Sequence, residues 1–276
     1  MAMKRTRPAT GKAPRAGTAS GPSPAPIAYV YCIVQSRAAP RPGRVKGVPG
    51  AGPPRAVALG GSRWLVLADV PAASFDEAAL AAGLKDVDWV GACAMAHDAV
   101  VMESMKSGPV VPMRLFTIFE DERRALGQAR LAARTIARTL RRVAGRAEYG
   151  VRIAAVPGAR PRADTAGRRL TGRSFLEQKR RQLEARRSQL AVPAEERRRI
   201  FDRLARLADE ARPRPIPEGG SRVWLDGAFL VPLGMATAFR REVRRLSTDL
   251  TRSGHEVTLT GPWPPYSFLD ADAQNP

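Results

Sequence analysis

The chain has 276 residues, of which 44% are hydrophobic, and this length and composition favour two compact domains. Two cysteines are too few for a disulfide-rich secreted scaffold, and the apolar run Ile27–Val34 is too short to span a membrane, so we expect a cytoplasmic protein. The formal net charge of +20 permits binding to an acidic partner, whether nucleic acid, an anionic membrane surface or a protein.

The first 119 residues predict a basic tail followed by a small α+β domain. Residues 1–26 contain basic side chains, no acid, and many Pro, Gly, Ser and Thr residues, which is typical of a disordered segment. Ile27–Val34 is apolar throughout, as expected of a central strand covered on both faces. The other elements expected in this domain, residues 27–119, are strands over 55–59 and 63–70 joined at Gly60-Gly61, a short helix opened by a Ser74/Glu77 capping box, a helix over 86–106 and a strand over 110–116.

Residues 120–268 predict a second α+β domain, which residues 269–276 follow as a flexible C-terminus. An amphipathic helix over 126–143 opens it, with apolar residues on one face and arginines on the other. The further expected elements are a strand over 149–153, a helical hairpin over 175–190 and 193–211, strands over 223–225 and 228–231 joined by a turn at Asp226-Gly227, a helix over 239–250 and a strand over 257–259.

Cysteine and histidine are scarce, which limits metal and catalytic chemistry. Cys93 and His97 stand four residues apart on an expected helix, and with Cys32 they could supply three metal ligands. A fourth ligand is missing, and packing on a helix face explains both residues, so we assign no metal site. Neither His97 nor His255 sits in a nucleophile motif. We therefore assign no catalytic residue and no cofactor, and we expect a protein that is not an enzyme.

The arginine-rich stretch from Arg168 to Arg214 offers an alternative function, a basic nucleic-acid-binding protein acting through its helices. Acidic residues interleave with these arginines, as on a solvated helix with ion pairs at i, i+3 and i+4. The stretch carries no helix-turn-helix, zinc-finger or RNP-like pattern. Nucleic-acid binding is therefore kept as the alternative, and not as the main interpretation.

The C-terminal segment Leu259–Phe268 combines prolines, which stiffen an extended chain, with aromatic side chains. Such a segment either covers the protein's own core or presents an aromatic surface to a partner. We predict that it docks in extended form, with Trp263 largely buried and the Tyr266 hydroxyl hydrogen-bonded. The candidate site residues are Gly261, Pro262, Trp263, Pro264, Pro265, Tyr266 and Phe268.

Four stretches of the chain, in order, resemble the GvpL/GvpF family of gas vesicle proteins. The most specific is Leu259–Phe268, which is similar to the family's C-terminal signature Leu-Thr-Gly-Pro-Trp-Pro-Pro-Tyr-x-Phe. Leu115-Phe116 stands where many members carry Phe-Gly. The other matching stretches are Tyr29–Val34, His97–Val101 with Pro109–Phe119, and Gly172–Leu176.

This resemblance implies a modified ferredoxin-like first domain and a second α+β domain. It also implies an accessory or minor structural role in gas vesicle assembly, with the small hydrophobic shell protein and other accessory gas vesicle proteins as partners. The protein would then be cytoplasmic and associated with gas vesicles, with no membrane and no specific nucleic acid as partner.

Overall fold

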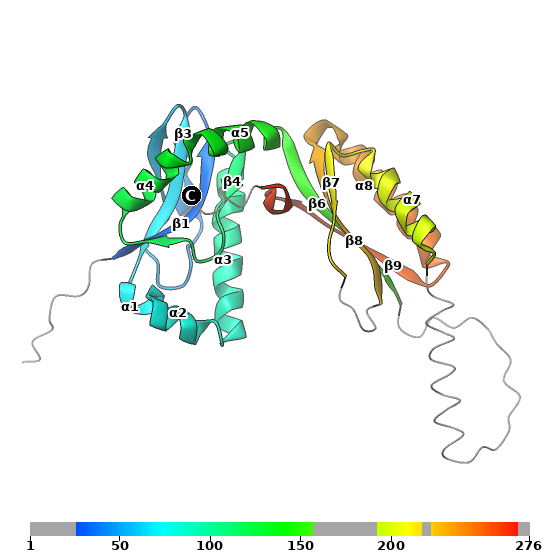
Figure 1. The fold of residues 1–276 in the computed structure, drawn as a ribbon, viewed down its shortest axis with the longest axis horizontal. Coiled ribbons are helices and arrows are strands. Elements are labelled where there is room, and N and C mark those ends of the chain that lie inside the picture. The colour runs from blue at the N-terminus through cyan, green and yellow to red at the C-terminus, as the bar shows by residue number, and fades with distance from the viewer. Residues whose placement is uncertain (1–25, 157–191, 217–221, 270–276) are drawn as a thin grey trace, which may run out of the picture.

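The computed structural model describes residues 26–156, 192–216 and 222–269, and these residues build two antiparallel sheets with helices (Figure 1). The α+β class predicted from the sequence is confirmed. The tail 1–25, the first helix of the expected hairpin and residues 270–276 lie outside the described residues. Among the described residues, no helix combines the length and hydrophobicity that a membrane span requires.

The first sheet has the strand order β2-β3-β1-β4, with β5 also paired to β1. The strand order is compatible with a modified ferredoxin-like domain, and that finer assignment stays a prediction. The elements of this part are β1 (Ile27–Gln35), η1 (Pro42–Arg44), β2 (Arg55–Gly60), β3 (Arg63–Val70), α1 (Ala72–Phe75), α2 (Glu77–Gly83), α3 (Val87–Met105), β4 (Val110–Pro112), β5 (Ile118–Phe119), α4 (Glu122–Leu131) and α5 (Ala133–Val143).

Strand β1 is central and buried on both faces, as its uninterrupted apolar sequence predicts. One face of the first sheet packs against α3, through residues such as Tyr29, Cys93 and Val100. The opposite face packs against α4 and α5, through residues such as Ile33 and Leu140. The first sheet is therefore the middle layer of three.

The predicted domain boundary after residue 119 does not follow this packing. Helices α4 and α5 were expected to open the second domain, but their apolar residues lie on the first sheet. Arg55 on β2 strengthens this attachment through an ion pair with Glu122 on α4, at 2.9 Å. The change from the first sheet to the second therefore comes after Val143.

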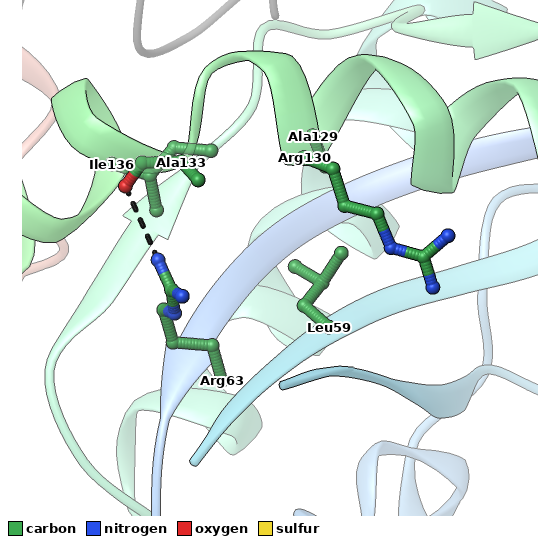
Figure 2. Close-up of a pocket in the computed structure, with 6 residues that line it drawn as sticks. All are labelled: Leu59, Arg63, Ala129, Arg130, Ala133 and Ile136. Atoms are coloured by element: carbon green, nitrogen blue, oxygen red, sulfur yellow. Dashed lines mark hydrogen bonds between the residues drawn. The ribbon is translucent and has the colours of Figure 1, made fainter. Parts of the chain in front are cut away.

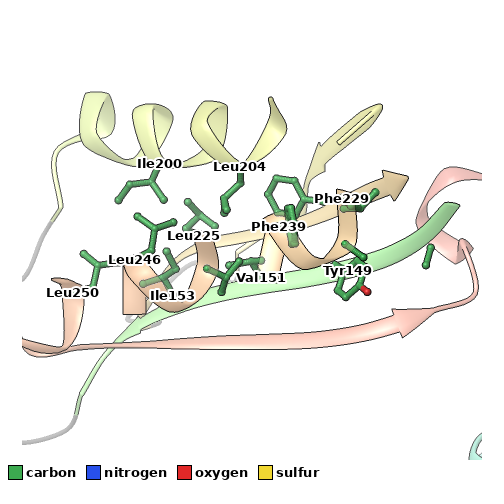
Figure 3. Packing of buried hydrophobic residues seen from close by; sticks show 14 of the residues in the cluster. Tyr149, Val151, Ile153, Ile200, Leu204, Leu225, Phe229, Phe239, Leu246 and Leu250 are labelled. Carbon is green, nitrogen blue, oxygen red and sulfur yellow. The ribbon is translucent and has the colours of Figure 1, made fainter. Parts of the chain in front are cut away.

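The second sheet has the strand order β7-β8-β6-β9 and helices on one face (Figure 1). Its core lies between that face and helices α7 and α8, where Tyr149, Leu204, Phe229 and Phe239 pack together (Figure 3). The elements are β6 (Arg146–Ala155), α7 (Ala194–Ala205), β7 (Glu210–Pro213), β8 (Val223–Pro232), η2 (Leu233–Met235), α8 (Ala236–Thr251), β9 (His255–Trp263) and η3 (Tyr266–Phe268).

The turn predicted at Asp226-Gly227 is wrong, because β8 runs straight through these residues. Gly227 pairs with Val151 on one side and with Pro213 on the other. A Cβ atom at Gly227 would come within 3.0 Å of the Phe201 and Phe229 rings, so the glycine makes room for ring packing. The Asp226-Gly227 pair is typical of a turn, but here the glycine is required for ring packing within a strand.

Four smaller predictions also need correction. The helix expected over 193–211 ends at Ala205, and Glu210–Pro213 form strand β7 instead. The helix expected over 126–143 is divided at Ala132 into α4 and α5, and the strand expected over 110–116 ends at Pro112. The Ser74/Glu77 capping box is not formed. Asp76 instead caps α2, since its carboxylate accepts a hydrogen bond from the Ala79 N–H at 2.8 Å.

Candidate functional site

The predicted site residues occupy the end of β9 and the segment after it, and we call Gly261–Leu269 the C-terminal strap. β9 continues through Pro262 and ends at Trp263, directly before Pro264 and Pro265. A bulge against β6 between Glu148 and Gly150 accommodates Gly261 and Pro262. Gly261 has φ +103°, and a Cβ there would lie 2.6 Å from the Glu148 carbonyl oxygen, so only glycine fits.

The aromatic residues of the strap separate into exposed and buried side chains. Trp263 is 38% exposed, so the prediction that it is largely buried is wrong. Pro264 and Pro265 are buried, and Phe268 is fully buried against Ala228 and Leu230 of β8. The next residue, Leu269, joins the core of the first sheet, although it was expected to begin a flexible C-terminus.

Tyr266 is hydrogen-bonded at its hydroxyl, as predicted. The hydroxyl donates to Oδ1 of Asp98 on α3 at 2.9 Å. Burial raises the pKa of Tyr266 above its ordinary value, and the negative charge of Asp98 raises it further. The phenol therefore remains a neutral donor, and it connects the strap to a helix of the first sheet.

Glu148 on β6 holds the other side of the strap. The residue is 2% exposed, and its carboxylate accepts hydrogen bonds from the Ser267 N–H at 2.8 Å and from the Ser267 hydroxyl at 2.6 Å. The Arg214 guanidinium donates to the same carboxylate at 2.6 Å and balances its charge. Arg212 adds a bond to the Ser267 carbonyl at 2.7 Å and lies over the Phe268 ring. The strap is thus fixed to both sheets (Figure 1).

Sequence reasoning missed the partners of the strap. Asp98 and Glu148 are acids far apart in the sequence, and no spacing rule connects either of them with Arg212 and Arg214 at the end of the arginine-rich stretch. The one available signal was Glu148, the single acid of a strand whose other charged residues are Arg146 and Arg152, because an acid among apolar neighbours implies a partner.

The possible metal ligands Cys32, Cys93 and His97 are buried in the core of the first sheet, where His97 contacts the rings of Tyr29 and Tyr31. The Tyr29 hydroxyl is hydrogen-bonded to Nδ1 of His97 at 3.0 Å and accepts a hydrogen bond from the Phe116 N–H. Burial lowers the pKa of His97 to about 4 and raises that of Cys32 to about 12, so the imidazole and the thiol are both neutral near pH 7. Within the described residues, no three His, Cys, Asp or Glu side chains form a group that could hold a metal ion.

A cavity between β2 and helices α4 and α5 is too small for a substrate. It measures about 10 Å³, which is room for one water molecule, and Leu59, Ala129 and Ile136 line it (Figure 2). Arg63 closes one side by donating to the Ala133 carbonyl at 3.1 Å. This cavity therefore offers no catalytic site.

The structure defines a two-sheet α+β protein whose C-terminal strap joins the sheets. The model of the family "Gas vesicle synthesis protein GvpL/GvpF" matches residues 27–270, and the chain belongs to this family. It is 34% identical over 262 residues to gas vesicle protein L of a Streptomyces species, covering 88% of this chain and 92% of that protein. Gas vesicle protein F2 of Halobacterium salinarum is 29% identical over 188 residues, covering 67% of this chain and 71% of that protein.

Two solved structures share the fold. The crystal structure of the gas vesicle protein GvpF from Anabaena aligns with a TM-score of 0.60 at 16% identity, over 89% of this chain and 98% of that chain. GvpF from Microcystis aeruginosa gives a TM-score of 0.59 at 14% identity, over 88% and 98% of the two chains. The protein thus has a role in gas vesicle assembly, and the names of these relatives give the nucleic-acid alternative no support.

Proposed function

We propose that this protein binds the small hydrophobic shell protein of the gas vesicle and thereby chaperones, nucleates or lines the growing vesicle. A shell subunit that polymerises through β-rich apolar surface is prone to aggregate before assembly. A soluble protein that binds such a surface would limit this aggregation and deliver the subunit. This role requires binding and no catalytic turnover.

Trp263 is the observation that carries the proposal. It belongs to the family's C-terminal signature, yet the fold leaves it 38% exposed while Phe268 is fully buried. A ring that is exposed to this extent contributes less to stability than a fully buried one. Tryptophan is enriched at the centres of protein interfaces, where its large apolar ring and N–H group both find partners. The exposed Trp263 therefore supports contact with a protein partner.

A pull-down of purified shell protein tests the proposal. The wild-type chain should retain the shell protein, and Trp263→Ala should retain clearly less of it. Leu131→Ala is the matched control, because it removes an apolar side chain that is 83% exposed on α4, away from the strap. Sequence-selective DNA binding with no retention of shell protein would favour the nucleic-acid alternative instead.

A further inference from the structure

The two edges of the second sheet differ in length and in protection. Strand β7 forms one edge with only four residues, which include Arg212 and Pro213. Short length, charge and proline are the usual protections of a sheet edge. Strand β9 forms the other edge with nine residues, and its only proline is Pro262 near the end. In the described part of the chain, β6 is the one strand that pairs with β9.

The register identifies the backbone groups that face the free edge of β9. The Val156 N–H donates to the Gly254 carbonyl at 2.9 Å, and the same register pairs Ala154 with Glu256 and Arg152 with Thr258. Hydrogen-bonded positions alternate along an antiparallel pair. The amides of Glu256 and Thr258 therefore point to β6, whereas Val257 and Leu259 direct their N–H and C=O groups outward.

The side chains of β9 also alternate. Val257 and Leu259 are half-buried and pack against the core beneath α7 and α8. Glu256, Thr258 and Thr260 are exposed on the other face of the sheet. A strand added beside β9 would extend the apolar face under the helices and the polar face on the other side of the sheet. Its side chains would therefore alternate, with apolar residues toward the helices and polar residues toward solvent.

We propose that the free edge of β9 binds an extended segment of the gas vesicle shell protein by strand addition. This inference rests on the proposed function and specifies its surface. An apolar, β-rich partner supplies the alternating segment that this edge accepts. A second copy of the chain fits less well, because each copy carries a formal charge of +20 and the two would repel each other. Exposed Trp263 lies at the end of the same strand.

Amide hydrogen exchange on the full chain tests this directly. Overlapping synthetic peptides that cover the shell protein sequence serve as the probe, and NMR resolves individual amides. The amides of Val257 and Leu259 should exchange quickly in the free protein and at least about tenfold more slowly with the binding peptide. The amides of Glu256 and Thr258 should already be protected and should change little. Unchanged exchange at Val257 and Leu259 with a bound peptide would overturn the inference.

A pair of variants gives a second measurement. Val257→Pro removes the outward N–H group, whereas Val257→Ala shortens the side chain and keeps that group. Retention of the shell protein should fall about tenfold in the proline variant relative to the alanine variant. Circular dichroism establishes whether Val257→Pro is folded, and if it is not, the exchange experiment decides alone. Equal retention by two folded variants would contradict strand addition.

The outcomes separate this inference from the proposed function. Shell protein that binds without protecting the β9 edge would leave the proposed function intact and refute the edge as its surface. A complete absence of shell-protein binding would refute both. Protection of Val257 and Leu259 that depends on protein concentration, with a dimer in sedimentation, would make a second copy the occupant and would overturn the proposal.

Discussion

The hydroxyl of Tyr266 donates a hydrogen bond to Oδ1 of Asp98 across 168 positions of the sequence. Asp98 belongs to α3, which packs on the first sheet, and Tyr266 follows the last strand of the second sheet. The bond is partly buried, so water competes with it less than at an open surface. In this chain the C-terminal strap therefore connects the two sheets.

Replacing Tyr266 by Phe should lower the free energy of unfolding by about 1–2 kcal/mol, because the ring remains while Asp98 loses its donor. Urea unfolding of the wild type and the variant gives this difference. The Asp98→Ala variant and the double variant complete a mutant cycle, in which the two losses should not be additive. Additive losses would show that the two side chains are not energetically coupled.

Trp263 and Phe268 should differ in their contribution to stability although both are aromatic residues of the strap. Phe268→Ala removes a fully buried ring and should cost about 3–5 kcal/mol. Trp263→Ala should cost only about 1–2 kcal/mol, because its ring is 38% exposed and leaves a smaller cavity. Thermal or urea unfolding of the two variants provides the comparison. A larger loss for Trp263→Ala than for Phe268→Ala would contradict the structure.

Glu148 should matter more than Ser267, because the carboxylate accepts from both Ser267 and Arg214. Glu148→Gln keeps the size of the side chain but weakens these charge-assisted bonds, at a cost of about 1–3 kcal/mol. Ser267→Ala removes only the hydroxyl and should cost about 1 kcal/mol. Urea unfolding again gives both values, and an unchanged Glu148→Gln variant would show that the carboxylate does not hold the strap.

Local patterns predicted the parts of the fold that local forces determine. The apolar run of β1 indicated a strand covered on both faces, and the expected helix over 86–106 is α3 with Asp86 as its cap. The turn predicted at Asp226-Gly227 was wrong because turn propensity is a local property. The packing of Phe201 and Phe229 on Gly227 is a tertiary effect. No local pattern could report that effect.

In the candidate site, too, local tendencies could be predicted from the sequence and tertiary partners could not. The sequence indicated that the strap docks and that Tyr266 has a partner, because prolines and aromatics carry those tendencies themselves. It could not identify Asp98 or Arg214 as partners, since Arg214 lies 66 positions from Glu148 and the sheet pairing brings them together. It also overestimated the burial of Trp263, because the frequency with which aromatic residues are buried does not say which ring of a cluster stays outside.

His97 should make stability depend on pH in a mildly acidic window. Its folded-state pKa is lowered to about 4, so between about pH 6.5 and pH 4 the unfolded chain binds a proton that the folded chain does not. The contribution to stability is complete above pH 6.5 and is lost as the pH falls toward 4, by about 3 kcal/mol in total. Urea unfolding at several pH values measures it, and His97→Gln should show a flatter profile there. Parallel profiles for the two proteins would refute this assignment.

Phe116 has an unusual backbone conformation, with φ +64°, in the left-handed region that favours glycine. An L side chain rarely adopts this conformation, so the residue at position 116 is under backbone strain. Two contacts hold the phenylalanine there. Its ring stacks on Trp89 with 5.4 Å between the centroids, and its N–H donates to the Tyr29 hydroxyl at 3.2 Å.

At position 116, the glycine variant should therefore be more stable than the alanine variant, which is the reverse of the usual order of stability. Both variants lose the ring and its stacking on Trp89, so their difference reports the backbone alone. In an ordinary strand or helix, alanine is more stable than glycine by about 0.5–1 kcal/mol. At φ +64° the Cβ atom is strained, and Phe116→Gly should instead be more stable than Phe116→Ala by about 1 kcal/mol. Urea unfolding of the two variants under identical conditions measures the sign. A more stable alanine variant would show that Phe116 does not have the left-handed conformation in solution.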